Sequence, residues 1–158
     1  ERGAGPLVTP LAGGKLSADA DMATSALALI ALARNSGRNG KTAADDPVIR
    51  DRIMDLVIRQ TAFNQSLRRS RVKELIDNPL RIPQQVKLLR SELAQEIAAL
   101  ALEIEGAAST LSIADGNAPA GGQWPQAYLN SFGMTIAAGT SEILRNILGE
   151  RILNLPKS

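Results

Sequence analysis

The stretch from Pro83 to Gly106 carries the most regular apolar pattern in the chain and restricts the folds open to it. Its apolar side chains recur at intervals of three and four residues, at Val86, Leu89, Leu93, Ile97, Leu100 and Ile104. This spacing predicts an amphipathic helix whose stripe packs against neighbouring helices at a shallow crossing angle. Because the stripe cannot stay in water, the rest of the chain must supply helices that cover it.

A second long helix is predicted from Pro47 to about Leu75, with Asp45 or Asp46 as its cap. Its stripe consists of Ile49, Ile53, Leu56, Val57, Phe63, Leu67 and Val72. The breaker Asp77-Asn78-Pro79 separates the two helices and predicts that they pack antiparallel.

Three shorter helices complete the prediction: one from about Asp19 to Arg34, one from Trp124 to Ile136, and one after Gly139. The stretches 37–46 and 114–123 are predicted as loops, because glycine and polar residues are concentrated there. The sequence has no strand pattern and no internal repeat, and its few aromatic residues favour an aliphatic core. We therefore expect an all-α antiparallel helical bundle, with residues 1–158 as a single domain.

Composition narrows the chemistry that the chain can perform. It has no cysteine and no histidine, which excludes thiolate and imidazole metal sites and leaves carboxylates as the groups for proton transfer near neutral pH. Acids and bases are interleaved and the net charge is only +2, so nucleic-acid binding is not expected. No apolar run is long enough to span a membrane, and no signal peptide is present. We expect a cytoplasmic protein and, because the sequence starts at Glu1 without methionine, a fragment or processed product.

The last segment, from Gly139 to Pro156, combines a capped helical pattern with a distinctive order of residues. Thr140 or Ser141 can cap a helix, and apolar residues follow at helical spacing. The string Gly-Thr-Ser-Glu-Ile-x-Arg-Asn-Ile-x-x-Glu-Arg-x-Leu-x-Leu-Pro resembles the C-terminal signature of acyl-CoA dehydrogenases. This resemblance implies the C-terminal helical domain of a longer flavoprotein from a bacterial subgroup, without the family's N-terminal helical domain and middle β domain.

The same resemblance implies an activity, a cofactor and partners. Family members remove a proton from the α carbon of an acyl-CoA thioester while a hydride passes from the β carbon to FAD. The implied partners are an acyl-CoA substrate, an electron-transfer flavoprotein or similar acceptor, and further subunits in homo- or hetero-oligomers. Gly139 is expected beside the substrate, and Thr140, Ser141 and Glu142 beside FAD. A plain capped turn is the alternative for this segment.

The catalytic base must be a carboxylate, and the resemblance offers two positions for it. The position immediately before Gly-Thr is Ala138, which cannot take a proton. The other is a Glu-Arg pair on the first helix of the domain, and Glu1-Arg2-Gly3 resembles that element. Glu1 is thus the candidate base, with Arg2 on the acyl-CoA side. Glu-Arg is also a common dipeptide, so a start without catalytic meaning is the alternative.

Four further segments carry candidate residues, and two of them correspond to flavin contacts of the family. Arg34 or Arg38 is a candidate for the FAD phosphates, with surface solvation as the alternative. The segment 103–107 replaces the family's Gln and one Gly by Glu103 and Ala107, and a carboxylate there would repel a pyrophosphate. Lys87 matches a lysine common in the family and is expected to be structural. The basic cluster from Arg68 to Lys73 is interpreted as a solvated helix face.

Three readings of the function stay open at this point. In the first, the chain belongs to an active dehydrogenase subunit with Glu1 as base. In the second, it belongs to a partner subunit whose catalytic position is vacant and which completes another chain's FAD site in a heteromer. The third is a helical-bundle interaction module, which leaves the C-terminal string without a purpose.

Overall fold

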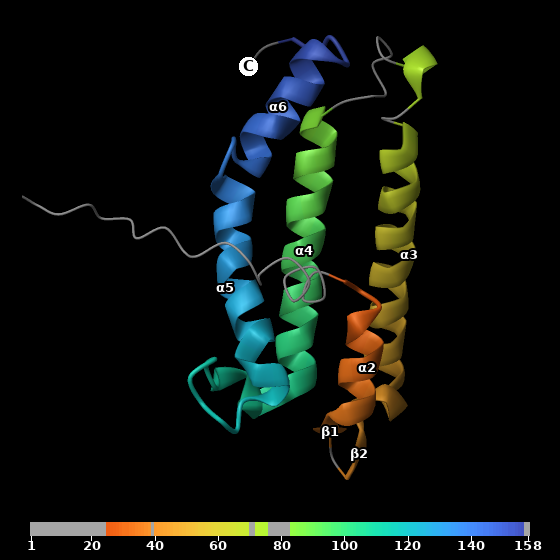
Figure 1. The fold of residues 1–158 in the computed structure, drawn as a ribbon. Coiled ribbons are helices and arrows are strands. Elements are labelled where there is room, and N and C mark those ends of the chain that lie inside the picture. Colours follow the sequence, from red (N-terminus) through yellow and green to blue (C-terminus); the bar gives the residue numbers. More distant parts are fainter. Residues whose placement is uncertain (1–24, 39, 70–71, 76–82, 157–158) are drawn as a thin grey trace, which may run out of the picture.

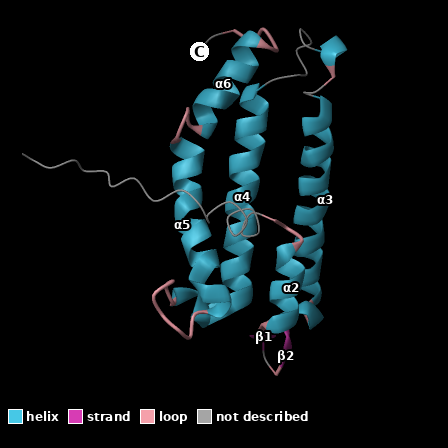
Figure 2. Ribbon diagram, viewed as in Figure 1, coloured by secondary structure: helices cyan, strands magenta, loops and turns pink. Residues whose placement is uncertain are grey.

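The computed structural model describes residues 25–38, 40–69, 72–75 and 83–156, and this part of the chain is a bundle of helices (Figures 1 and 2). The helices are α2 (Ala28–Asn35), α3 (Pro47–Arg69), α4 (Pro83–Glu105), α5 (Gln123–Ile136) and α6 (Ser141–Arg151). Short 3-10 turns occupy Ala43–Asp45, Lys73–Leu75, Gly106–Thr110 and Pro119–Gly122. The predicted all-α class is confirmed.

One feature was not predicted, a minimal hairpin of β1 (Gly37–Arg38) and β2 (Lys41–Thr42). Its strands pair antiparallel, with Gly37 opposite Thr42 and Arg38 opposite Lys41. Two residues per strand are too few to produce an alternating pattern in a sequence, which explains why the stretch reads only as a loop. The hairpin leads the chain from α2 back towards α3.

Helices α3 and α4 pack antiparallel, as predicted, and their ion pairs record the register. Arg52 on α3 pairs with Glu103 on α4, and Arg59 pairs with Glu96. A step of seven residues forward on α3 thus corresponds to a step of seven backward on α4. The four side chains are largely exposed, so these pairs add little stability and mainly fix the alignment. The predicted breaker between the helices lies outside the described residues.

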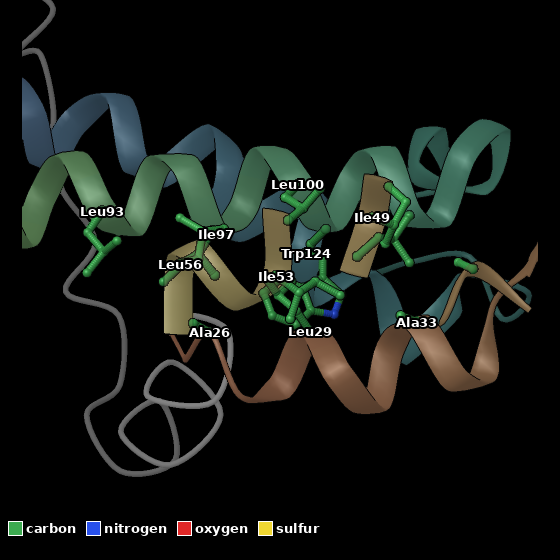
Figure 3. Close-up of a cluster of buried hydrophobic side chains, with 13 residues drawn as sticks. Ala26, Leu29, Ala33, Ile49, Ile53, Leu56, Leu93, Ile97, Leu100 and Trp124 are labelled. Atoms are coloured by element: carbon green, nitrogen blue, oxygen red, sulfur yellow. The ribbon is translucent and has the colours of Figure 1, made fainter. Parts of the chain in front are cut away.

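The core lies where α2, α3, α4 and the start of α5 meet (Figure 3). Its largest members are Leu29, Ile49, Ile97, Leu100, Ile104 and Trp124. The predicted stripe of α4 is buried from Leu93 to Ile104, but Leu89 is 41% exposed. Trp124 is only 2% exposed and packs among aliphatic side chains. The core is therefore aliphatic as expected, apart from one large aromatic side chain at its centre.

The second half of α3 departs from the prediction. The helix ends at Arg69 and not near Leu75, and Phe63 and Leu67 are only half-buried. Among the described residues, α2 lies beside the first half of α3 in Figure 1, and the amide of Ala26, just before α2, donates to Gln60 Oε1 at 2.8 Å. Phe63 and Leu67 lie beyond the part of α3 that α2 covers. The predicted start of the first helix at Asp19 lies outside the described residues, and α2 is described from Ala28.

Asp46 and Asp45 have different roles at the start of α3. The Asp46 side chain accepts the N–H of Val48 at 2.9 Å and caps the helix, while Pro47 is its first residue. The Asp45 carboxylate instead accepts hydrogen bonds from the hydroxyl and the amide of Thr42, and these bonds lower its pKa.

Among the described helices, none has the length and hydropathy needed to cross a bilayer.

Candidate functional site

The junction between α5 and α6, which we call the elbow (residues 137–140), is built on two unusual backbone conformations. Ala138 has φ = 56° and Gly139 has φ = 101°. A φ of 101° strains any residue with a Cβ atom, which explains the glycine. Space is not the reason, because a Cβ at Gly139 would meet the nearest side-chain atom, of Leu144, only at 3.6 Å. Ala137 and Ala138 are exposed, and Gly139 and Thr140 are partly exposed, so a ligand can reach this part of the chain.

The first turn of α6 satisfies part of its own hydrogen-bonding capacity. Thr140 is the N-cap, and its hydroxyl oxygen accepts the N–H of Ile143 at 3.4 Å. The Glu142 carboxylate accepts its own backbone N–H and the Thr140 hydroxyl, and these bonds lower its pKa. The charge of Glu142 therefore lies at the positive end of the helix. An incoming anion would compete with that carboxylate, so the first turn is less free than the sequence suggests.

Helix α4 holds the elbow and α6 from the side. The ammonium group of Lys87 donates to the carbonyl oxygen of Gly139 at 2.6 Å and to that of Thr135 at 3.2 Å. Farther along, Arg145 on α6 pairs with Glu92 at 2.6 Å, and Leu144 is buried. The expectation that Lys87 is structural agrees with these contacts. Sequence reasoning did not indicate that its partner would be the elbow.

The predicted arginines lie at the other end of the bundle, beside the hairpin. Arg38 pairs with Asp46 at 3.5 Å and donates to the carbonyl oxygen of Glu103 at 3.3 Å, so it ties the hairpin to the end of α4. Arg34 is exposed and makes no ion pair with any described residue. It lines an open recess of about 400 Å³ together with Arg50 and apolar residues such as Ile30. Figure 1 shows the hairpin and the elbow on opposite sides of α4.

The segment 103–107 at the end of α4 differs from what its sequence predicted. The Glu103 carboxylate is paired with Arg52, which offsets the charge expected to repel a pyrophosphate. Both carboxylate oxygens of Glu105, by contrast, are shielded from solvent and have no hydrogen-bond partner among the described residues. This burial raises the pKa of Glu105 to about 7. Glu105 was not singled out from the sequence, although it continues the stripe of small buried residues formed by Ala98 and Ala101.

The Glu105 carboxyl should make the stability of the domain depend on pH. Its pKa is about 7 in the folded state against an ordinary 4.5, so the folded state retains the proton longer than the unfolded state. The contribution of this carboxyl to stability is therefore fully present below about pH 4.5 and is lost as the pH rises through about 7. We expect the loss between about pH 5 and pH 8 to be about 1–2 kcal/mol after allowance for solvent screening. In Glu105→Gln this loss should disappear.

Urea unfolding followed by circular dichroism at both pH values measures the difference. The comparison uses the change with pH and not the absolute stability, because a buried amide has its own cost. Glu74→Gln is the matched control, since Glu74 is exposed. If the free energy of unfolding changes equally with pH in the wild type and in Glu105→Gln, the prediction is wrong, because the Glu105 carboxyl then ionises in the folded protein without loss of stability.

The remaining predicted site residues, Glu1 and Arg2, lie outside the described residues. Of the others, the elbow brings Gly139, Thr140, Ser141 and Glu142 together, whereas Arg34 and Arg38 lie apart from them at the hairpin. The structure thus presents two candidate ligand surfaces, an exposed main-chain elbow and an arginine-lined recess.

Comparisons with known proteins agree with the resemblance noted in the sequence. Residues 17–153 match the family model described as acyl-CoA dehydrogenase, C-terminal domain. The protein named acyl-CoA dehydrogenase IpdE1 from Mycolicibacterium smegmatis is 33% identical over 130 residues, which cover 82% of this chain and 30% of that protein. The protein of the same name from Mycobacterium tuberculosis is 30% identical over 132 residues, covering 82% and 31%. The chain thus spans less than a third of the length of these relatives. No solved structure matches it.

Proposed function

The chain belongs to the acyl-CoA dehydrogenase family, and we propose that it is the C-terminal domain of an FAD-dependent member that introduces a double bond between the α and β carbons of an acyl-CoA thioester. The observation that carries the proposal is the family match over residues 17–153, which encloses the elbow and α6. The two relatives that bear the name of this activity support it. Because the chain spans less than a third of their length, the activity belongs to a longer protein.

In this proposal Glu1 removes the α proton of the substrate and Arg2 lies on the acyl-CoA side. FAD, when bound, accepts the hydride from the β carbon. A carboxylate that is partly desolvated beside a thioester has a raised pKa, which suits a base working near neutral pH. Ala138 stands at the alternative position of the base and has no group that takes a proton.

The described residues fit FAD at two places and oppose it at a third. The exposed elbow offers main chain to a ligand, because Gly139 has no side chain to prevent a close approach. Arg34 is exposed in a recess without a carboxylate among its lining residues, which suits a phosphate. The segment 103–107 is less suitable, because Glu103 and Ala107 replace the family's Gln and one Gly, and the Glu103 carboxylate is already paired with Arg52. We therefore assign FAD contacts to Thr140, Ser141 and Glu142 and, because Arg34 lies apart from them, a separate contact of Arg34 with the FAD phosphates of a neighbouring subunit.

A second candidate function rests on one residue. Ala138 leaves the motif position without a base, which favours a partner subunit that completes the FAD site of another chain in a heteromer. The two functions differ in whether flavin reduction depends on Glu1. They share the acyl-CoA substrate and an acceptor such as an electron-transfer flavoprotein, and we place both in the cytoplasm.

The outer face of α5 supports the proposal that the domain is covered by other parts of the protein or by another subunit. Leu129, Phe132 and Ile136 recur at helical spacing on that helix and are between 43% and 66% exposed. Ile143 adds a further exposed apolar side chain beyond the elbow. A row of this kind marks a surface that is buried in an assembly. We include homo- or hetero-oligomerisation through the bundle in the proposal.

Separating the domain from the rest of the protein tests the assignment. We expect the chain of 158 residues alone to bind FAD weakly or not at all, because the family's flavin contacts come largely from the middle domain and a neighbouring subunit. The full-length protein should be purified with bound flavin. Absorbance spectra of both proteins after gel filtration with added FAD provide the comparison. A yellow, stoichiometric flavoprotein formed by the isolated domain would refute this division of the site.

A further inference from the structure

Lys87 occupies an uncommon position for a lysine. It lies early in α4 and is half-buried, yet among the described residues no carboxylate pairs with it. Its ammonium group bonds to two main-chain carbonyl oxygens, those of Thr135 and Gly139. Since α5 ends at Ile136, the lysine meets the negative end of that helix, where carbonyl groups lack partners within the helix. The charge of Lys87 is thus balanced by the backbone of the elbow.

The bond to Gly139 also fixes the direction of a peptide group. In a trans peptide the carbonyl oxygen of one residue and the N–H of the next point to opposite sides, and no described peptide bond is cis. The Gly139 carbonyl is drawn inward to Lys87, so the N–H of Thr140 points away from α4. Within the described part of the chain, that N–H donates no backbone hydrogen bond.

The backbone around this peptide group needs such support. Ala138 at φ = 56° adopts a conformation that residues with a side chain rarely adopt, whereas Gly139 at φ = 101° is unstrained but poorly restrained. Glycine in particular has many alternative conformations, so without a restraint the 139–140 peptide can rotate. Leu144 and the Arg145–Glu92 pair hold α6, but among the described residues it is Lys87 whose side chain donates a hydrogen bond to the Gly139 carbonyl. Lys87 supplies the restraint at that atom.

We infer that Lys87 is a positioning residue: it holds the Gly139 carbonyl inward and so presents the Thr140 N–H to an acceptor oxygen of the ligand at the elbow. The inference rests on the proposed function for the identity of that ligand, an acyl thioester or a flavin. The restraint that Lys87 places on the elbow does not depend on the proposed function, because it exists without a ligand. A donor held in place before binding loses less entropy when the ligand arrives.

Lys87→Met in the full-length protein tests the inference, since methionine keeps the apolar length and removes the charge and the donors. We expect amide hydrogen exchange in the segment 136–143 to accelerate by about tenfold or more, while helix α3 keeps its protection. We also expect KM for acyl-CoA or the rate of flavin reduction to worsen by about 10- to 100-fold. Lys87→Arg, which restores a cation with several donors, should recover most of both losses.

The control is Lys73→Met, because Lys73 is exposed and the chemical change is the same. If Lys87→Met does not fold, Lys87→Leu replaces it, with the same expectations, because leucine also has no charge and no donor. Unchanged exchange in the segment 136–143 of a folded variant would overturn the inference. So would faster exchange with unaltered kinetics, since the elbow would then be restrained without consequence for the ligand. If the wild type reduces no flavin with any acyl-CoA, the proposed function fails, and the exchange measurement still decides the role of Lys87.

Discussion

Replacing Glu1 by Gln in the full-length protein is expected to abolish flavin reduction by acyl-CoA while FAD remains bound. Glutamine preserves the shape of the side chain but cannot take the α proton, and the chain has no histidine or cysteine to replace it. Loss of a general base costs about 10²- to 10⁴-fold in rate. Rapid-mixing measurements of flavin absorbance under anaerobic conditions, with the flavin content checked separately, give both quantities.

Ala138→Glu in the Glu1→Gln background provides the matched rescue. Position 138 is exposed and already holds a residue with a Cβ atom at φ = 56°, so a longer side chain has room there. Because the family reaches the same α proton from both positions, we expect part of the rate to return. Undiminished flavin reduction in Glu1→Gln itself would place the base outside this chain and favour the partner-subunit function.

Trp124→Ala is expected to have the largest effect on stability. Trp124 is 2% exposed and joins α5 to the cluster formed by α2, α3 and α4 (Figure 3). Truncating a buried aromatic side chain to alanine costs about 3–5 kcal/mol, because contacts are lost and a cavity is left. That is a large part of the 5–15 kcal/mol that stabilises a typical domain. Urea unfolding must be followed by circular dichroism, since the variant has no other tryptophan.

Leu129→Ala is the control on the same helix, because Leu129 is 66% exposed. Its effect on the isolated domain should stay within about 0.5 kcal/mol. A loss below about 1 kcal/mol in Trp124→Ala would mean that α5 is not anchored through the core.

The long helices were predictable because their burial repeats. The stripe of α4 is covered over several turns, so a period of three and four residues appears in the sequence and places the core. In the second half of α3 the stripe continues, but Phe63 and Leu67 are only half-buried and lie beyond the part of the helix that α2 covers. Periodicity indicates which face a helix would bury, but it does not indicate how far a neighbouring helix extends along that face. The central position of Trp124 in the core was not predicted for a related reason, because a single large side chain produces no periodic pattern.

The candidate site was less predictable, because its contacts join residues distant in sequence. The cap at Thr140 is local and was foreseen as one of two choices. The bond from Lys87 to Gly139 joins residues 52 positions apart, and nothing near either residue in the sequence indicates the other. Arg52 neutralises Glu103 across two helices in the same way, which changes the expected electrostatics of the segment 103–107. The burial of Glu105 was also not predicted. A charged residue is normally expected on the surface of a helix, even where it continues an apolar stripe, unless the neighbouring elements are known.

Titrating the full-length protein with acyl-CoA thioesters in the absence of oxygen tests the central proposal most directly. The account predicts that the purified protein carries FAD and that its flavin absorbance bleaches on addition of a suitable acyl-CoA, with an enoyl-CoA formed in equal amount. A flavin that stays oxidised with every acyl-CoA offered, and that bleaches only after a second, different chain is added, would contradict it.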